Sequence, residues 1–489
     1  MQLSQMLEGL DVKTIIGEID NLDIDSLSID SRANISDGLY FCLSGFSVDG
    51  HEFAQDAVSA GAIAVVSERV LEIDTPQIVV ENSRIAMAHI AAAFNGFPAK
   101  KLKFITVTGT NGKTSTTYFL RNILRRAGYK VGLFGTIGIY IDDIKLPSNL
   151  TTPDPIEFHA VLRQMLELGV EVVVMEASAH AITLNKLYGV QAEVSILTNI
   201  TQDHIDFYGT FDKYANAKLG YFVEDNVKMA VVNVDSEHGR QLLHEAKMPV
   251  FTYGLDNPAG VFAVNCMFDV NGTQYFLNLF DHLFQIESKM LGKFNLYNAL
   301  GAACACKVFG VAPEIIAKGL NAMTAIDGRF NVITLPNKTS VIIDYAHTPD
   351  GLQNILSATR GICKGKIYSV FGCGGNRDSL KRPIMGKISA ELADFTVITS
   401  DNSRFEKPEE IIAQIEEGAR QVSDSYICLP DRREAIRYTL NEMKPGDATV
   451  LSGKGAENYL DVMGVKHAYS DALYVNEVLE TILQEEKSC

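Results

Sequence analysis

A glycine-containing segment between a buried strand and a helix is the feature that most constrains what this chain can fold into. Residues 103–108 are mostly apolar or β-branched, which predicts a buried strand, and residues 114–127 carry apolar side chains at helical spacing. The segment between them consists of Gly109, Thr110, Asn111, Gly112, Lys113, Thr114 and Ser115. Strand, glycine turn and helix in this order form a βα unit, which predicts a mostly parallel sheet covered by helices.

The same alternation recurs along the rest of the chain. Further strands are predicted at residues 62–66, 77–80, 170–175, 194–198, 229–234, 340–343, 366–371 and 395–399, and further helices at 155–168, 211–223, from 349 onward, 382–392 and 408–422. With about 150 residues per domain, a chain of 489 residues suggests three domains. We predict an α/β protein with a small N-terminal α/β domain (1–98), a central P-loop-type domain with a mostly parallel sheet (99–332) and a C-terminal Rossmann-like domain (333–489).

Charge and hydropathy exclude several kinds of partner. The chain has 43 Lys and Arg against 60 Asp and Glu, a net charge of −17, which disfavours binding to nucleic acid or to an anionic membrane. Its longest uncharged run, residues 85–99, is shorter than the roughly 18 apolar residues of a membrane span. The N-terminus lacks a basic start and a long apolar stretch, so we expect a cytoplasmic protein. The eight cysteines form no CxxC pair, which favours reduced thiols.

The glycine segment is suited to binding phosphate. Backbone N–H groups at a helix N-terminus attract anions, Lys113 would reach the β and γ phosphates of a nucleotide, and Thr114 would bind Mg²⁺. Because Val107 stands where the strict pattern has its first glycine, a purely structural glycine turn is the alternative. ATP is the favoured ligand.

Polar residues also follow the next strands. Glu176 and His180 stand at the end of one strand, and Asp203, His204 and Asp206 follow the next strand, so a second divalent ion could use a carboxylate and an imidazole from these two strand ends. The alternative is that each is a loop residue with satisfied hydrogen bonds. Lys218 lies on a helical segment, where a solvated lysine is the simpler interpretation.

The C-terminal third repeats this arrangement at three strand ends. Asp344 and His347 suit a ribose and a base, although a plain strand-to-helix turn would look similar. A glycine loop at 372–378 follows the next strand. Residues 401–404 then offer acceptors and a guanidinium group that suit a zwitterionic amino acid, with a solvated Asx turn as the alternative.

As an ordered set, these segments resemble the Mur ligase family along the whole chain. The supporting segments are residues 30–32, 49–51, 109–115, 151–153, 203–206, 292–298, 328–329, 344–349, 372–383, 401–404 and 453–457. The resemblance implies an ATP-dependent amide-bond ligase that adds the third amino acid to UDP-N-acetylmuramoyl-L-alanyl-D-glutamate through an acyl phosphate, during peptidoglycan precursor synthesis. It further implies small-molecule substrates only, and we expect a monomer.

The resemblance also implies a role for each matched residue. UDP would be held by Ile29, Ser31, Phe46, Ser47 and Val48, and the muramoyl dipeptide by Thr151, Thr152, Ser178 and Lys186. Lys113, Glu176, His204 and Lys218 would be catalytic; Thr114 would bind one Mg²⁺, and Glu176, His204 and Lys218, carbamylated to N6-carboxylysine, a second. Gly109 to Ser115 with Asn295, Arg329, Asp344 and His347 would bind ATP, and Arg377, Asp401, Asn402, Ser403, Arg404, Gly453 and Glu457 the incoming amino acid.

The identity of that amino acid depends on the segment around Arg404. Members that use meso-diaminopimelate typically carry an arginine there, which favours diaminopimelate over L-lysine or L-ornithine. Departures from the family pattern at Leu150, Ala179, Leu184 and Lys186 gather near the acceptor site and leave open a ligase for another acceptor. A nucleotide-binding regulator without turnover is a second alternative.

Overall fold

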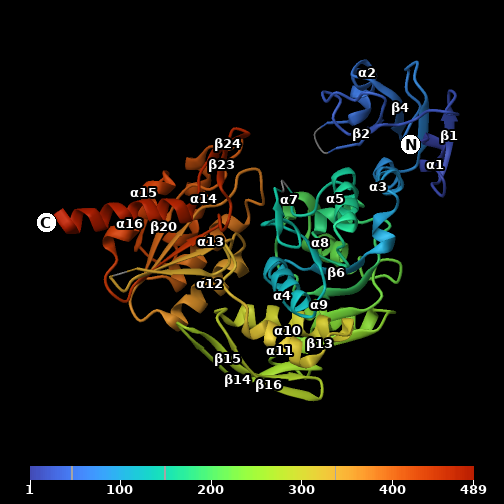
Figure 1. Cartoon of the computed structure of the whole chain (residues 1–489). Helices are drawn as coiled ribbons and strands as arrows, with labels where there is room; N and C mark the ends of the chain where they lie inside the picture. The colour runs from blue at the N-terminus through green and yellow to red at the C-terminus, as the bar shows by residue number, and fades with distance from the viewer. Residues whose placement is uncertain (46–47, 148–149, 336, 489) are drawn as a thin grey trace. The chain divides into compact units, whose positions relative to one another are not determined.

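The computed structural model (Figure 1) describes residues 1–45, 48–147, 150–335 and 337–488. The chain divides into two compact units, each drawn from several chain segments. The first unit comprises Met1–Thr108, Gly128–Ser195 and Gly220–Met229. The second comprises Gly109–Ala127, Ile196–Leu219 and Ala230–Cys489.

The N-terminal part of the first unit is a five-stranded sheet in the order β1-β5-β4-β3-β2. Its strands are β1 (Val12–Ile16), β2 (Ser26–Ser28), β3 (Gly38–Phe41), β4 (Ala62–Ser67) and β5 (Gln77–Val80), and its helices are α1 (Leu3–Met6), η1 (Gly50–Phe53), α2 (Ala54–Ser59), α3 (Ser83–Phe94) and η2 (Pro98–Lys101). Only β1 runs antiparallel to its neighbour. Asn82 caps α3 through its side-chain oxygen, and α3 buries Met87 and Ile90 against the sheet. The strands predicted at 62–66 and 77–80 are thereby confirmed.

The rest of the first unit carries strands in the order β6-β10-β7-β8-β9. They are β6 (Lys103–Thr108), β7 (Val131–Gly135), β8 (Gly138–Ile141), β9 (Ile144–Leu146) and β10 (Val172–Glu176), with helices α5 (Pro155–Glu167) and α6 (Ala179–Thr183); β11 (Ala192–Leu197) begins in this unit. β6, β10 and β7 are parallel, whereas β7, β8 and β9 form an antiparallel meander that the sequence analysis did not predict.

In the second unit, α4 (Lys113–Arg126) lies beside α10 (Lys293–Phe309), which also contacts strands β12 to β15. The strands are β12 (Ala230–Asn233), β13 (Val250–Gly254), β14 (Val261–Asp269), β15 (Gly272–Leu279) and β16 (His282–Ser288), and the other helices are α7 (Ile205–Tyr208), α8 (Phe211–Leu219), α9 (Glu237–Glu245) and α11 (Pro313–Asn321). β12 to β14 are parallel, and β14 to β16 form a second antiparallel meander. The helix predicted at 211–223 is shorter in the structure, because Gly220 follows its last residue.

The C-terminal part of this unit is a six-stranded sheet in the order β17-β18-β22-β19-β20-β21. Its strands are β17 (Asn331–Thr334), β18 (Ser340–Asp344), β19 (Ile367–Phe371), β20 (Phe395–Ile398), β21 (Tyr426–Cys428) and β22 (Ala448–Ser452), and a hairpin of β23 (Tyr459–Val462) and β24 (Val465–Ala468) follows. All pairs except β17 with β18 are parallel.

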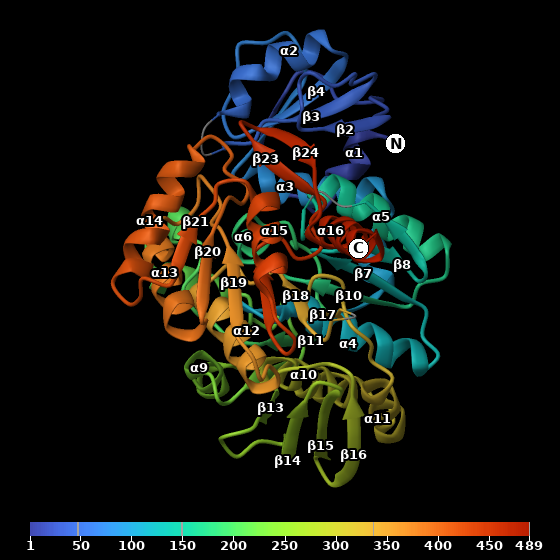
Figure 2. The ribbon, with the colours of Figure 1, turned by 90° about the vertical axis from the view of Figure 1, so that its left-hand side faces the viewer.

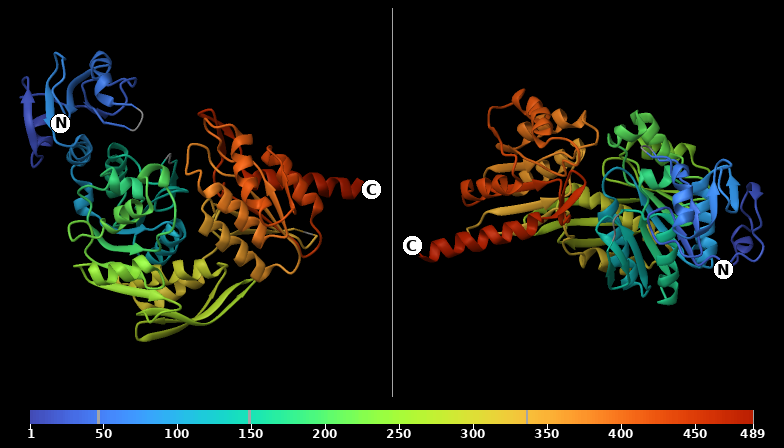
Figure 3. Two further views of the ribbon diagram at one scale, coloured as in Figure 1. Left: turned by 180° about the vertical axis from the view of Figure 1, so that it is seen from behind. Right: turned by 90° about the horizontal axis from the view of Figure 1, so that it is seen from above.

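Helices cover both faces of this C-terminal sheet. They are α12 (Pro349–Ile362), α13 (Lys381–Leu392), α14 (Pro408–Arg420), α15 (Arg432–Glu442) and α16 (Asp471–Ser488). One apolar core joins the sheet to α12, α13 and α14, and a separate core joins it to α15 and α16. Figure 2 shows α13 and α14 beside β20 and β21, and in Figure 3 the end of α16 projects beyond the sheet. Two covered faces of a parallel sheet define a doubly wound α/β fold, as predicted.

Among the described residues, no helix combines the length and the apolar character that a membrane span requires.

Candidate active site

The glycine segment that follows β6 folds around the amine of Lys113. Lys113 Nζ donates hydrogen bonds to the carbonyl oxygens of Gly109 (2.9 Å) and Thr110 (2.7 Å). Gly112 caps α4 with a φ of 86°, and a Cβ added there would collide with the side chain of Asn298. The segment therefore needs glycine both for its left-handed turn and for close packing, and it places a cation at a helix N-terminus, where phosphate binds.

A second lysine reaches the same loop. Lys218 Nζ donates to the Gly109 carbonyl oxygen at 2.8 Å and lies 5.0 Å from the centre of the Tyr214 ring. The residue is 1% exposed, so the interpretation as a solvated lysine is wrong. Burial, together with the positive charge of Lys113, holds the pKa of Lys218 well below its usual range. An amine that loses its proton this readily can act as a nucleophile toward CO₂.

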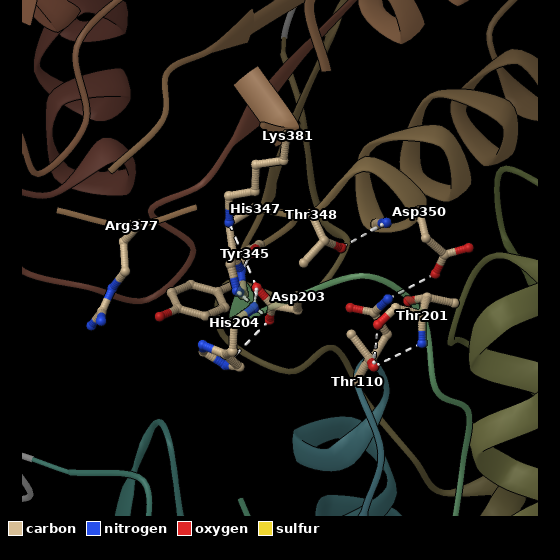
Figure 4. A network of polar contacts seen from close by, with 12 residues as sticks. Thr110, Thr201, Asp203, His204, Tyr345, His347, Thr348, Asp350, Arg377 and Lys381 are labelled. Atoms are coloured by element: carbon tan, nitrogen blue, oxygen red, sulfur yellow. Dashed lines mark hydrogen bonds and ion pairs between the residues drawn. The ribbon is translucent and has the colours of Figure 1, made fainter. Parts of the chain in front are cut away.

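A buried carboxylate, Asp203, collects three cationic or titratable groups (Figure 4). Its Oδ2 lies 3.3 Å from His204 Nε2 and 3.9 Å from His347 Nε2, and its Oδ1 lies 3.7 Å from Lys381 Nζ. Burial alone would raise the pKa of Asp203, but these neighbours outweigh it and the net pKa is lowered. The aspartate is therefore a stable anion that ties β11's following loop to residues from the C-terminal sheet.

Two further bonds join the glycine segment to distant parts of the second unit. Asn111 Nδ2 donates to Asp350 Oδ2 at 2.7 Å, and Arg329 Nη2 donates to Thr114 Oγ1 at 2.8 Å. The Arg329 guanidinium also lies over the ring of Tyr345, 4.6 Å from its centre. Four of the residues predicted around the nucleotide or its metal, Asn111, Thr114, Arg329 and Lys113, thus belong to one connected region.

Three further residues that were predicted to bind the nucleotide form hydrogen bonds with backbone groups. The carboxylate of Asp344 accepts from the backbone N–H groups of Phe330 and Ala346, both at 2.7 Å, and burial raises its pKa. His347 Nδ1 lies 2.8 Å from the Tyr345 carbonyl oxygen, and burial and Lys381 lower the pKa of His347, so its ring is neutral. Asn295 is buried and donates to the Leu291 carbonyl oxygen.

Residues predicted to bind the amino acid meet at the ends of β20 and β22. Asn402 Nδ2 donates to Glu457 Oε2 at 3.0 Å, and a Cβ on Gly453, whose φ is 108°, would lie 2.5 Å from Asp401 Oδ2. Asp401, Asn402 and Ser403 are buried, which contradicts the alternative of a solvated Asx turn. Carboxylate and amide groups in this arrangement can bind an ammonium group.

Arg404 is held in an unusual backbone conformation. Its φ is 50°, its N–H donates to the Asp461 carbonyl oxygen, and its Nη1 donates to the Gly375 carbonyl oxygen at 2.7 Å. The left-handed region is costly for a residue other than glycine, so the surrounding hairpin must impose it. Arg377, by contrast, is paired with Asp206 at 3.9 Å.

In the first unit, the predicted acceptor residues gather around Glu176. Glu176 accepts from the N–H (2.8 Å) and hydroxyl (3.1 Å) of Thr136, whose hydroxyl also lies 3.1 Å from that of Thr151. Thr152 Oγ1 donates to the Glu176 carbonyl oxygen and lies 3.5 Å from Ser178 Oγ. Lys186 Nζ donates to the Thr152 carbonyl oxygen and pairs with Asp154 at 2.8 Å.

The residues predicted to hold UDP are less completely described. Ile29 and Val48 are exposed, at 39% and 54%, and Ser31 is half-buried beside Asp30, whose carboxylate binds the Arg32 guanidinium through both oxygens. Phe46 and Ser47 lie outside the described residues. Exposed apolar side chains next to a polar turn are compatible with a base and a ribose.

Metal and thiol chemistry can be compared with the predictions only in part. Across the described ranges, no group of three or more His, Cys, Asp or Glu could hold a metal ion. The predicted second site depends on a carbamate at Lys218, a group the unmodified side chain lacks, so that site stays a prediction. Cys373 is buried, which raises the pKa of its thiol to about 12 and keeps it protonated.

Sequence reasoning gave no individual role to several residues that the structure places at the centre of these contacts. They are Asp203, Tyr345, Asp350, Lys381 and Lys454. Each stands at or next to a segment that the sequence analysis had singled out, so adjacency to a motif was the available signal. Their partners come from other strands, which no local pattern reveals.

Family comparisons match three stretches of the chain. Residues 107–306 match the Mur ligase middle domain, residues 328–455 the Mur ligase glutamate ligase domain, and residues 23–95 the Mur ligase family catalytic domain.

Curated relatives are similar over nearly their full length. A UDP-N-acetylmuramoyl-L-alanyl-D-glutamate--2,6-diaminopimelate ligase 1 of Clostridium acetobutylicum is 41% identical over 478 residues, covering 96% of this chain and 97% of the relative. A protein named as the corresponding ligase of Geobacillus kaustophilus is also 41% identical, over 90% of this chain and 91% of its own.

Solved structures also match this chain over nearly its full length. A structure titled as a UDP-N-acetylmuramoyl-L-alanyl-D-glutamate--2,6-diaminopimelate ligase superposes with a TM-score of 0.67 at 28% identity, covering 98% of both chains. A MurF ligase of Thermotoga maritima in complex with ADP has a TM-score of 0.64 at 19% identity, covering 96% of this chain and 100% of its own, a likeness of fold alone.

Proposed function

Because this chain belongs to the Mur ligase family, we propose that it joins meso-diaminopimelate to UDP-N-acetylmuramoyl-L-alanyl-D-glutamate with ATP, in the synthesis of peptidoglycan precursors. The observation that carries this proposal is the arrangement around Arg404. Its guanidinium is anchored on the Gly375 carbonyl oxygen in the same segment in which Asn402 bonds Glu457. A cation next to an amide and a carboxylate fits an amino acid that carries an additional carboxylate and an additional ammonium group.

The reaction follows from the weak reactivity of a carboxylate toward an amine. An oxygen of the acceptor's carboxylate attacks the γ-phosphorus of ATP, and ADP leaves with the electrons of the broken P–O bond, giving an acyl phosphate. The amino nitrogen then attacks the acyl carbon, the tetrahedral intermediate expels phosphate, and the nitrogen loses a proton. Positioning and charge neutralisation supply most of the rate in such transfers.

ATP lies, in this proposal, at the glycine segment. The left-handed Gly112 and the ammonium of Lys113 give α4 a cationic start that suits the phosphates. The full set of ATP-binding residues comprises Gly109, Thr110, Asn111, Gly112, Lys113, Thr114, Ser115, Asn295, Arg329, Asp344 and His347.

Mg²⁺ would neutralise phosphate charge when bound. Thr114 presents a hydroxyl oxygen at the start of α4, which is a ligand that Mg²⁺ accepts. The proposed second set is Glu176, His204 and Lys218 as N6-carboxylysine. The burial and lowered pKa of Lys218 support this modification, because only the neutral amine adds to CO₂.

The two other substrates take the remaining groups. The acceptor is proposed to bind Ile29, Ser31, Phe46, Ser47, Val48, Thr151, Thr152, Ser178 and Lys186, and the amino acid Arg377, Asp401, Asn402, Ser403, Arg404, Gly453 and Glu457. Lys186 donates to the Thr152 carbonyl oxygen and pairs with Asp154, so an anionic acceptor would replace or share that carboxylate.

The proposal includes a monomeric cytoplasmic enzyme with domains 1–98, 99–332 and 333–489. The first boundary falls in the connection between α3 and β6, whereas the second falls inside β17, which pairs with β18 of the C-terminal sheet. Only small molecules are expected as partners.

Phosphate release from ATP tests the proposed function. The wild-type protein is incubated with Mg²⁺, bicarbonate and UDP-N-acetylmuramoyl-L-alanyl-D-glutamate, and with meso-diaminopimelate, L-lysine, L-ornithine or no amino acid. Release with diaminopimelate alone is expected. Release with lysine or ornithine instead would reassign the amino acid, and no release with any of them despite ATP binding would reassign the acceptor or make the protein a regulator.

A further inference from the structure

A fully buried lysine lies among the proposed amino-acid residues without a role in the reaction. Lys454 is 0% exposed, and its Nζ donates to Glu457 Oε2 at 2.6 Å and to Asn402 Oδ1 at 3.0 Å, with Asp401 Oδ1 at 3.8 Å. Burying an ammonium group is costly unless its charge is compensated. Its position between two carboxylates supplies that compensation and leaves the group of three with one net negative charge.

A tyrosine from another strand end holds the other oxygen of the same carboxylate. Tyr345 Oη donates to Glu457 Oε1 at 3.2 Å, whereas Lys454 and Asn402 both bond Oε2. Glu457 therefore receives donors from the ends of β18, β20 and β22. Its side chain is 20% exposed, so the residue is not sealed from solvent as Lys454 is.

Tyr345 also connects this carboxylate to the nucleotide loop. The Arg329 guanidinium lies over the Tyr345 ring and donates to Thr114 at the start of α4. The path from Thr114 through Arg329 and Tyr345 to Glu457 lies within the second unit. A change at the tyrosine hydroxyl alone leaves the aromatic face under Arg329 in place, so the two halves of the path can be separated.

We propose that Tyr345 and Lys454 are positioning residues that fix the Glu457 carboxylate for the ammonium group of the incoming amino acid. The inference rests on the proposed function, because that function places the amino acid at Glu457. A glutamate side chain has three rotatable bonds, and fixing it before the substrate arrives removes an entropic cost from binding. Lys454 adds a charge effect: without it, Asp401 and Glu457 would face each other as an uncompensated pair.

The first test compares two Tyr→Phe variants of the full-length protein. Tyr345→Phe is expected to raise the KM for diaminopimelate about five- to tenfold, the size of one lost hydrogen bond of ordinary strength, while the KM for ATP stays within about twofold. Tyr426→Phe is the matched control. Tyr426 lies in β21 of the same sheet, and its hydroxyl also donates to a glutamate, Glu416 of α14, at 3.0 Å. Wild-type KM values in Tyr345→Phe would overturn the inference.

The second test is a double-mutant cycle with Lys454→Met and Glu457→Gln. If Lys454 acts through Glu457, the double variant has the same KM for diaminopimelate as Glu457→Gln alone, because the removed ammonium then has no carboxylate to orient. If the two effects multiply, Lys454 acts independently and the inference fails. Thermal melting and the KM for ATP check that each variant is folded, and the tyrosine comparison stands even where Lys454→Met does not fold.

Failure of the proposed function would look different from failure of the inference. A wild-type protein without diaminopimelate-dependent phosphate release, or a Glu457→Gln variant with a wild-type KM, would contradict the proposed function. The inference alone would be contradicted if the wild type were active and Glu457→Gln raised the KM for diaminopimelate, but the Tyr345 and Lys454 variants left it unchanged.

Discussion

Asn111 and Asp350, 239 residues apart in the chain, form a 2.7 Å hydrogen bond between the glycine segment and the first turn of α12. Burial raises the pKa of Asp350, and the Asn111 amide partly offsets this by stabilising the charged form. The bond fixes a side chain of the phosphate-binding segment from outside its own loop. It therefore makes the nucleotide site dependent on the C-terminal sheet.

Removing this carboxylate should weaken ATP binding. In Asp350→Ala, Asn111 loses its acceptor, and we expect the KM for ATP to rise about threefold to tenfold, equivalent to roughly 1 kcal/mol. Glu409→Ala is the control, since it also removes an acidic residue from the first turn of a helix, α14, that packs on the same sheet. Steady-state kinetics at saturating amino acid measure both variants, and an unchanged KM for ATP in Asp350→Ala would show that the bond does not shape the site.

The glycine segment makes a steric prediction. Gly112→Ala should weaken ATP binding at least about tenfold, because the new Cβ collides with Asn298 and a non-glycine residue at φ 86° costs roughly 1–2 kcal/mol. Gly128→Ala has the same kind of strain, with a φ of 92°, but no atom within 4 Å of its Cβ. Calorimetric titration with ATP separates strain from collision. If both variants lost ATP affinity equally, the loss would come from backbone strain, which the two share, and not from the collision in the phosphate-binding loop.

Lys218 is predicted to be essential through its modified form. Lys218→Ala should lose most activity and regain part of it with added short carboxylates, which replace the carbamate in the cavity left by the side chain. Lys213→Ala, on the exposed side of the same helix, should retain wild-type activity. The assay is ADP formation with and without acetate or formate; a fully active Lys218→Ala would remove the carbamate from the mechanism.

Arg404 is predicted to select the amino acid. Arg404→Ala should raise the KM for diaminopimelate roughly 10- to 100-fold, the loss of a charge-assisted interaction worth about 1.5–3 kcal/mol, with little change for ATP. Arg420→Ala provides a surface control, since its pairing with Glu416 is largely exposed. Comparable effects of Arg404→Ala on both KM values would contradict its place in the amino-acid site.

His159 gives a prediction about stability and pH. The ring is 1% exposed, both of its nitrogens lack a hydrogen-bond partner, and burial lowers its pKa to about 4 from 6.5. Between pH 6.5 and pH 4, His159 binds a proton in the unfolded chain but not in the folded chain. The free energy of unfolding is therefore unaffected by His159 above pH 6.5 and falls as the pH is lowered toward 4. At pH 5 the loss is about 2 kcal/mol.

Urea unfolding at pH 7.5 and pH 5.0 measures this effect. His159→Leu should lose less stability than the wild type over that interval, and His244→Leu, which changes an exposed histidine, should behave as the wild type does. An identical loss in wild type and His159→Leu would assign the acid sensitivity to other groups.

Local patterns were sufficient for part of the sheet and helix order. The strand and helix around the glycine segment, and the alternation between residues 340 and 422, were predicted within a few residues because each element carries its own apolar periodicity. The antiparallel meanders at β7 to β9 and β14 to β16 were not predicted. In the second meander the strands expose many side chains, such as Met267 and Leu283, and in the first β8 and β9 have only four and three residues, so the sequence signal is weak in both.

The sequence by itself determined which residue types stand at the strand ends, and hence the nucleotide, carboxylate and amino-acid chemistry of the family. The tertiary structure alone decided that Asp203 would gather His347 and Lys381, and that Tyr345 and Lys454 would hold Glu457. The physical reason is that these partners follow different strands, and Asp203 follows a strand of a different sheet from His347 and Lys381. Spacing along the chain carries no record of which strands become neighbours, whereas burial makes each of those charges depend on the neighbour it meets.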